Sequence, residues 1–512
     1  MTYILFIFLV NVSILAQAPY SFNFQSIAKD SKGEIISNQR VSFRITILEG
    51  SETGTAVYSE IHSITSNQFG LANLSIGEGE TSDLFSAIDW GVSTYYIKVE
   101  LDINGGSDYQ EVGVSQLRSV PYAIYANNSV EAVSVAGIYN IMNYGASNTG
   151  ADSETTTKAI NDAVADLQLQ TGNKGVIYFP PGRYLINDQI DIDLSDTREG
   201  ITIKGDGPGV TVLAFESSAS NGFHITFPPA GGYDGNTGSI IIKDFSIETM
   251  NAGVGDAIHL VSSGTTSPAP HKLIENVTIT GSSTSNYWKN GIRLTNCTFT
   301  NIRGVQFQGK SNSADWEGVA VLMEGMENPV DNFITNLRVW NADKAVEITG
   351  HCEGVTIDQS IFLAINKGIH WHTDTDGHEP WLGINNCHIS ASEACVFAEQ
   401  LMQCQINNNL FYCQAKTDVD WAGIWFSSLS PTDYDFLQIT HNTIHGFENG
   451  SGLRNGILLN NVKNSLISGN IIYNVITGVN LNTVSNSKVL DNMVFGSTNG
   501  VVETNCTGNT IR

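Results

Sequence analysis

Apolar and polar positions recur as a fixed unit over the last two thirds of the chain, most clearly in LISGNIIYNVITGVNL at positions 466–481. Ile467 and Ile472 are the inward positions of two short strands, and Asn470 lies at the bend between them. After a turn, Gly478 and Val479 open a third strand. The unit repeats every 22 to 33 residues, a period typical of solenoids. The pattern therefore predicts an all-β array of stacked coils.

Ten coils can be indexed by their bends. The bend positions are Phe245, Val277, Val305, Leu337, Ser360, Cys387, Asn409, Asn442, Asn470 and Asn492. The last four are Asn, which tolerates a left-handed bend and can hydrogen-bond to its neighbour in the stack. We therefore predict an asparagine ladder inside the C-terminal coils.

The strand after each bend begins with a small residue and an aliphatic one. Because side chains alternate across a strand, the residue after this pair faces out, and so does the residue two positions later. The first set is His259, Arg293, Ala320, Glu347, His370, Phe397, Trp425, Leu458, Asn480 and Val502. The second set includes His372 and Glu399. Charged and aromatic residues concentrate in coils two to seven, which predicts a functional groove there.

The N-terminal part of the chain differs from the repeats. Residues 17–126 contain strands with two-residue periodicity, such as Val41-Ser-Phe-Arg-Ile-Thr-Ile, and predict a small β-sandwich domain. Through Ser119-Val-Pro-Tyr-Ala-Ile-Tyr-Ala and similar stretches, this part resembles a domain common on secreted proteins of the Bacteroidetes. Residues 1–16 are predicted to be a signal peptide, and residues 127–137 a linker.

The repeats begin with a helix from Thr155 onward, whose apolar positions run from Ala159 to Leu167, and a strand–Pro-Pro-Gly–strand segment at Gly175–Ile186. A helix here would close the exposed end of the stack. With the Tyr144-Gly-Ala opening, this region resembles the entrance to right-handed parallel β-helices of the pectate-lyase superfamily. The resemblance implies that residues 138–512 form such a β-helix. The superfamily contains lyases, glycoside hydrolases, epimerases and phage tailspikes, so it leaves the activity open.

Composition narrows the partners and the location. The net charge of −26 argues against a nucleic-acid partner, because no basic patch in the sequence offsets it. No stretch after the signal peptide is long and apolar enough to span a membrane. The seven cysteines form no C-x-x-C pair and are expected as buried thiols. We expect an exported protein, secreted or periplasmic, whose partner is a polysaccharide. The sequence leaves its oligomeric state open.

Aromatic residues near the predicted groove favour sugar stacking, because a sugar ring presents an apolar face. The candidates for substrate binding are Trp288, Trp316, Trp421, Trp425, Arg293 and His259. The sequence predicts no cofactor. Asp374 and Asp376, in the loop after His372, are the weak candidates for Ca²⁺.

Two reactions compete for the same residues. Hydrolysis needs an acid and a carboxylate, and Glu347 and Glu399 lie two coils apart, roughly 9.6 Å by strand spacing. Asp315 and Glu317 are alternative acids, and His370 and His372 would hold water or sugar hydroxyls. β-Elimination would instead use a histidine base and Arg293 as the cation that neutralises a uronate. The sequence slightly favours a glycoside hydrolase over a lyase. A polysaccharide epimerase and a non-catalytic, tailspike-like glycan-binding protein remain alternatives.

Overall fold

The computed structural model describes residues 21–88, 90, 93–118, 137–169, 174–194, 200–227, 238–263, 271–310, 315–326, 329–373, 379–414, 420–429, 435–446 and 454–512. The chain divides into two compact units, Met1–Val130 and Glu131–Arg512. The signal peptide predicted at residues 1–16 lies outside the described residues, and so do residues 127–136 of the predicted linker. Both remain predictions.

The first unit is a small antiparallel β domain. Its strands are β1 (Phe22–Ile27), β2 (Arg40–Glu49), β3 (Thr55–Thr65), β4 (Leu71–Ile76), β5 (Tyr95–Asp102) and β6 (Gln110–Gln116), with a 3₁₀ turn η1 (Phe85–Ala87). Strands β3-β2-β5-β6 form one sheet, and β1 pairs with β4 in another. Inward residues such as Phe43, Ile45 and Leu74 form one core between them. The alternating pattern of the sequence therefore gives the predicted small β domain.

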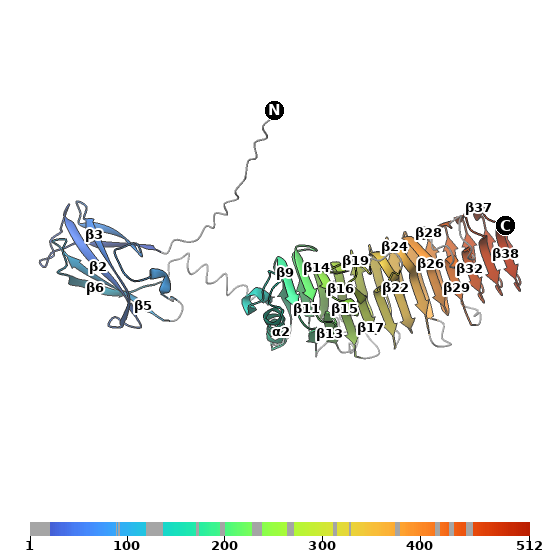
Figure 1. The fold of residues 1–512 in the computed structure, drawn as a ribbon, viewed down its shortest axis with the longest axis horizontal. Helices are drawn as coiled ribbons and strands as arrows, with labels where there is room; N and C mark the ends of the chain where they lie inside the picture. The colour runs from blue at the N-terminus through green and yellow to red at the C-terminus, as the bar shows by residue number, and fades with distance from the viewer. Residues whose placement is uncertain are drawn as a thin grey trace, which may run out of the picture. The chain divides into compact units, whose positions relative to one another are not determined.

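The second unit is a parallel β-helix, in which each turn of the chain places its strands beside those of the preceding turn (Figure 1). The strands form three parallel ladders. The first ladder contains β10 (Ile190–Asp193), β13 (Phe223–Phe227), β15 (Ala252–Ser262), β17 (Tyr287–Thr295), β20 (Val319–Gly325), β29 (Trp421–Ser427), β32 (Arg454–Asn460), β35 (Thr477–Asn482) and β38 (Asn499–Thr504).

The other two ladders complete the walls of the coil. The second contains β7 (Ile138–Asn140), β8 (Lys174–Tyr178), β11 (Gly200–Lys204), β18 (Thr300–Arg303), β21 (Asn332–Thr335), β23 (Val355–Asp358), β25 (Glu379–Asn385), β27 (Leu401–Asn407), β30 (Gln438–Thr440), β33 (Leu466–Ser468), β36 (Lys488–Leu490) and β39 (Thr510–Ile511). The third contains β9 (Gly182–Ile186), β12 (Thr211–Phe215), β19 (Gln306–Gln308), β28 (Leu410–Cys413), β31 (Thr443–His445), β34 (Ile471–Tyr473) and β37 (Met493–Phe495).

Long strands turn from one ladder into the next. Strands β14 (Ser239–Thr249) and β16 (His271–Gly281) join the second ladder to the third, and β22 (Arg338–Gly350), β24 (Ile361–His372) and β26 (His388–Glu399) join the third to the first. Helix α2 (Ser153–Leu169), after the 3₁₀ turn η2 (Ile141–Tyr144), packs Ile160, Ala163 and Leu167 into the same core as the first coils. The predicted end cap is therefore present.

The predicted asparagine ladder lies inside the C-terminal coils. The Nδ2 groups of Asn409, Asn442 and Asn470 each donate to the Oδ1 of the next Asn along the stack, at 2.8 to 3.0 Å. The left-handed residue is not the ladder Asn, however. It is the residue before it, for example Asn408 with φ 58° and His441 with φ 57°. The residue before each ladder Asn therefore adopts the left-handed conformation of the bend, and the Asn that follows points inward and stacks on its neighbours.

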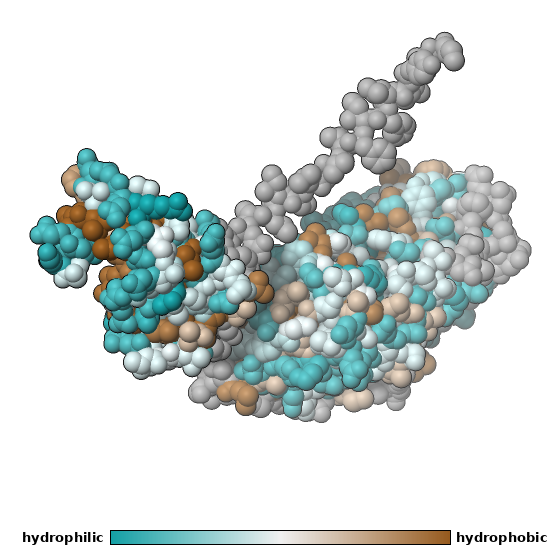
Figure 2. Space-filling model, turned by 60° about the vertical axis from the view of Figure 1, so that its left-hand side comes forward, coloured by the Kyte–Doolittle hydropathy of each residue, from teal (hydrophilic) through white to brown (hydrophobic). Residues whose placement is uncertain are grey.

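The small residue that opens each first-ladder strand is required by close stacking. A Cβ on Gly456 would lie 2.6 Å from the carbonyl oxygen of Gly478 in the next coil and 2.4 Å from Ile472 Cγ2. All seven cysteines lie in the described part of the chain, where they form no disulfide, and six are buried, as predicted. None of the helices in the described part of the chain is long and apolar enough to cross a bilayer. On the side seen in Figure 2, hydrophobic residues are scattered among hydrophilic ones.

Candidate functional site

The outward row of the first ladder is continuous across the predicted groove. His259, Arg293, Leu322, Glu347, His370, Phe397 and Trp425 are successive register partners, one per coil. The residues between them, including Ile348 and Trp371, are buried in the core. The alternation predicted from the sequence therefore holds for Glu347 and His370. Coils stack with the spacing of neighbouring strands, about 4.8 Å.

The third coil departs from the predicted register. Ala320 was expected to face out, but it is buried, and Leu322 occupies the row between Arg293 and Glu347. The strand therefore runs two residues later than predicted. This shift places Glu324 beside Thr295 and Thr349 on the outer face, a carboxylate that the sequence reasoning missed.

Glu347 is the most strongly perturbed acid of this face. Its Oε1 lies 2.8 Å from Lys344 Nζ, 3.4 Å from His372 Nε2 and 3.7 Å from His370 Nδ1. Burial alone would raise the pKa of Glu347, but the contacts with the two histidines and Lys344 outweigh it and hold the pKa well below its usual range. Glu347 is therefore an ionised carboxylate at neutral pH.

His370 lies between two carboxylates. Its Nδ1 faces Glu347, and its Nε2 lies 3.8 Å from Glu399 Oε2. The imidazole stacks on Phe397 with ring centroids 5.0 Å apart and planes at 6°, and on His372 at 4.7 Å. Phe397 in turn packs on Trp425 at 4.5 Å. The structure thus brings Glu347, His370, His372 and Glu399 together, as predicted from their positions.

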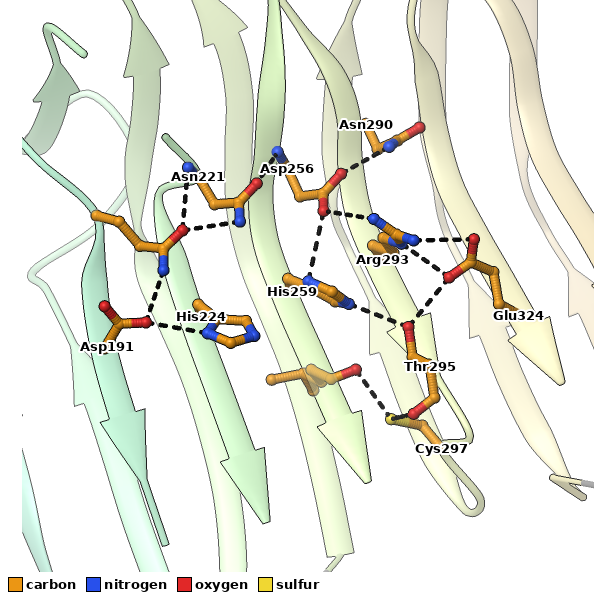
Figure 3. Close-up of polar contacts among 12 residues, drawn as sticks. Asp191, Asn221, His224, Asp256, His259, Asn290, Arg293, Thr295, Cys297 and Glu324 are labelled. Carbon is orange, nitrogen blue, oxygen red and sulfur yellow. Dashed lines mark hydrogen bonds and ion pairs between the residues drawn. The ribbon is translucent and has the colours of Figure 1, made fainter. Parts of the chain in front are cut away.

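Arg293 belongs to a separate polar network on the preceding coils (Figure 3). Its Nε and Nη2 donate to Glu324 at 2.8 and 3.1 Å, and its Nη1 donates to Asp256 at 3.3 Å. Burial would lower the pKa of the guanidinium, but the two carboxylates raise it. Asp256 also accepts a 2.6 Å hydrogen bond from Asn290. The sequence reasoning missed both acids, and together they form ion pairs with the guanidinium.

His259 is the neighbour of Arg293 in the row. Its Nδ1 lies 3.5 Å from Asp256 Oδ2, and its Nε2 lies 3.0 Å from Thr295 Oγ1. Burial lowers the pKa of His259 to about 4, and Asp256 offsets only part of that effect. The imidazole is therefore neutral at physiological pH, and it supports the network rather than presenting a charge to a ligand.

A groove of about 660 Å³ opens beside Glu347. Its lining includes the predicted residues Arg293, Asp315, Trp316, Glu317 and Glu347, together with Lys289, Asn290, Leu322, Glu324, Asp343, Lys344 and Asn366. Glu317 contacts Lys310 and the hydroxyl of Tyr287, and these hydrogen bonds lower its pKa. Glu317 is thus an ionised residue and a poor proton donor. Asp315 is exposed at the groove.

The predicted aromatic contacts divide into two groups. Trp288 and Trp421 are 1% and 2% exposed, so their predicted role in sugar stacking is wrong. Trp421 donates its indole N–H to the carbonyl of Ala391 at 3.1 Å, inside the core. Trp316 and Trp425 are half-buried and lie at the surface of the predicted groove region. The calcium candidates Asp374 and Asp376 lie outside the described residues.

Comparison with known proteins adds a family to this geometry. Residues 138–390 match the model described as rhamnogalacturonase A/epimerase, pectate lyase-like. Residues 23–114 match a domain of unknown function. A search of curated proteins gives no match.

Solved structures share the β-helix at low identity. The A-module of the Azotobacter vinelandii mannuronan C-5 epimerase AlgE6 has a TM-score of 0.48 and 17% identity, over 73% of this chain and 99% of that chain. The Yersinia enterocolitica family 28 exopolygalacturonase has a TM-score of 0.37 and 10% identity, over 96% of each chain. The tailspike of E. coli bacteriophage HK620 has a TM-score of 0.43 and 11% identity, over 73% and 79%. These likenesses concern the fold alone. With its parallel coils, its capping helix α2 and the matched segment 138–390, the chain is a right-handed parallel β-helix protein of the pectate-lyase superfamily, preceded by a small β domain.

Proposed function

We propose that the chain is an exported polysaccharide-cleaving enzyme, and that it is a glycoside hydrolase acting in the groove beside Glu347. The carrying observation is that Lys344, His370 and His372 hold the Glu347 carboxylate ionised on the outer face, with Glu399 on the far side of His370. The match of residues 138–390 to a rhamnogalacturonase/epimerase model supports a polysaccharide as the substrate.

The two carboxylates take the roles that hydrolysis requires. An inverting glycosidase needs one carboxylate to take a proton from water and one carboxylic acid to protonate the leaving oxygen. Glu347 fits the base, because its surroundings keep it ionised. Glu399 takes the role of the acid, because 42% of its side chain is exposed and it can therefore reach the leaving oxygen. Their strands are two coils apart, roughly 9.6 Å, near the upper end of the separation of about 6.5–9.5 Å in inverting enzymes.

The charge of the groove favours hydrolysis over β-elimination. Elimination requires a cation that is available to neutralise the uronate carboxylate. Arg293 is paired with Glu324 and Asp256, and Lys344 with Glu347 and Asp343. The third cation of the lining, Lys289, is exposed, but the lining holds five acids, Asp315, Glu317, Glu324, Asp343 and Glu347, against these three cations. Such a groove suits a neutral sugar chain better than a polyuronate, and Trp316 offers it a stacking surface.

The test is digestion of neutral and uronate-containing polysaccharides by the purified protein, following reducing ends, unsaturated uronates and sugar composition. We expect reducing ends without unsaturated product, and the first product anomer inverted by NMR. Glu347→Gln and Glu399→Gln should abolish cleavage, and Trp316→Ala should raise KM. Glu275→Gln is the matched control, because Glu275 pairs with Arg303 on the second ladder.

Other results of the same assays would support the alternative functions. Unsaturated uronate product would make the protein a lyase. A changed sugar composition at constant chain length would make it an epimerase. Binding without any cleavage, unaffected by Glu347→Gln, would make it a glycan-binding protein. Export is tested separately, by sequencing the N-terminus of the mature protein, which we expect to begin after Ala16.

A further inference from the structure

We propose that Glu347, His370 and His372 bind a divalent transition-metal ion such as Zn²⁺. One ligand atom from each residue lies within 4.8 Å of the other two. Bonds of about 2.0–2.1 Å to a tetrahedral ion place neighbouring ligand atoms about 3.4 Å apart. The Glu347 oxygen is 3.4 Å from His372 Nε2 and 3.7 Å from His370 Nδ1. Two edges of the site thus already have nearly the length that a bound ion requires.

The β-helix fixes the direction of all three side chains. His370 and His372 alternate with Trp371, which is fully buried, so both imidazoles leave the same face of β24. Glu347 is the register partner of His370 on the preceding coil. Stacking on Phe397 holds the His370 ring in place. The ligands therefore come from two adjacent rigid strands, which favours a preorganised site.

The surroundings of His370 supply an independent indication. Both of its ring nitrogens are buried and make no hydrogen bond within the described residues, although buried polar groups normally have a partner. A metal ion would satisfy Nδ1. The N–H at Nε2 would then point toward Glu399, 3.8 Å away, and a small approach of this carboxylate would give the carboxylate–histidine–metal arrangement common in metal sites.

The ligand set favours one class of ion. Imidazole nitrogens suit Zn²⁺ and other transition metals, whereas Ca²⁺ and Mg²⁺ prefer oxygen ligands. Lys344 competes for the same Glu347 oxygen at 2.8 Å. It also lies 3.4 Å from Asp343 Oδ2, so the ammonium can move onto Asp343 when an ion binds. Binding itself does not depend on the proposed hydrolysis. Only a role for the ion in activating water would rest on it.

The experiment uses tag-free full-length chain, treated with a chelator and titrated with ZnCl₂ by calorimetry. We expect one tight site in the wild type, lost in Glu347→Gln and in His372→Gln. Glu399→Ala should weaken binding about 10- to 100-fold, the usual effect of removing such an outer partner. His388→Gln, which alters a histidine on the third ladder, should bind like the wild type. Circular dichroism in metal-free buffer checks that each variant is folded.

A second measurement needs no variant. Co²⁺ bound to the wild type should give the intense visible absorption of a four-coordinate site. The weak spectrum of hydrated Co²⁺, or Zn²⁺ binding that survives loss of both histidines, would overturn the proposal. Because no sugar is present in either measurement, the two proposals fail separately. A protein that binds the ion but cuts no polymer refutes the hydrolase alone, and a protein that cuts polymers without binding the ion refutes the metal site alone.

Discussion

Replacing Arg293 by Met distinguishes a structural cation from a substrate-binding one. In the structure the guanidinium joins Glu324 to Asp256, whose side chain is 5% exposed. The substitution leaves Asp256 as a buried charge with its 2.6 Å hydrogen bond from Asn290 and a 3.5 Å contact to His259. A buried anion without its cation is costly, so we expect the variant to be less stable.

The expected loss follows from the exposure of the partners. Removing one member of a fully buried ion pair costs about 3–5 kcal/mol. Here 34% of the Arg293 side chain and 26% of that of Glu324 are exposed, so water screens part of the interaction. We therefore expect a loss of about 2 kcal/mol in the free energy of unfolding, below the range for fully buried pairs. Lys289→Met is the control, because Lys289 is exposed in the same groove, and it should change stability by less than about 0.5 kcal/mol.

Urea unfolding followed by tryptophan fluorescence measures the difference. Seven of the eight tryptophans lie after residue 137, so the signal reports mainly on the β-helix. The double variant Arg293→Met with Asp256→Asn should lose less than the sum of the single losses, because the second change removes the unpaired charge. An Arg293→Met loss no larger than that of Lys289→Met, with additive single effects, would refute the ion-pair argument.

The same variant tests the lyase alternative. A cation that neutralises a uronate would, when removed, impair activity on acidic polymers and leave neutral ones unaffected. We expect instead that Arg293→Met changes activity on both classes alike, through the displaced network beside Glu347. A selective rise of KM on acidic polymers, at unchanged stability, would restore Arg293 as a substrate-binding residue.

Two further predictions concern the core. Lys272 is fully buried beneath Phe227, and burial lowers its pKa to about 8, against about 10.4 in the unfolded chain. The cost of burying this charge, about 3 kcal/mol, is therefore present below pH 8 and disappears as the pH rises toward 10.4, so stability should rise over that window. Lys272→Met should raise the urea midpoint at pH 7 and abolish the rise, and a lower midpoint at pH 7 would contradict this. Asn442→Ala should cost about 1–3 kcal/mol, because it removes donors to Ile406 and Asn470 inside the ladder. Asn482→Ala, which loses one half-buried bond to Asn460, should cost about 0.5 kcal/mol or less in the same assay, and equal losses would refute a special role for the ladder.

The sequence predicted most of the β-helix because the repeat of apolar positions follows from the need to bury one side of every coil. Inward positions must be apolar in every coil, so alternation alone placed Glu347 and His370 outside. It failed in the third coil, where two pairs of small and aliphatic residues, Gly318-Val319 and Ala320-Val321, follow each other. The backbone of Gly318 is left-handed, with φ 95°, and the ladder begins after it, with Val321 beside Ile292. Only the pairing with neighbouring coils decides between the two pairs.

The tryptophans were misplaced for a different reason. Long intervals between bend and strand predicted projecting loops, and Trp288 and Trp421 fell at their ends. In the structure the strands begin earlier, at Tyr287 and Trp421, so these residues already belong to the wall of the coil. Trp288 packs edge-to-face on Phe215 at 5.8 Å. A large aromatic side chain fits the core and a sugar-binding surface equally well, so residue type alone could not separate the two.

The choice between a hydrolase and a lyase depends on whether a cation is available to a substrate carboxylate. The residues of the neighbouring coils determine whether it is available. The sequence made Arg293 a candidate cation for a uronate carboxylate. Its partners Asp256 and Glu324 come from the coils on either side, within reach because adjacent strands lie about 4.8 Å apart. The lyase and hydrolase mechanisms differ in whether such a cation can meet a substrate carboxylate. In a stacked array, a charged residue must therefore be judged together with the outward residues of both adjacent coils. By that criterion Arg293 and Lys344 are engaged, while Glu399, which lies 3.8 Å from His370 and has 42% of its side chain exposed, is accessible to a ligand.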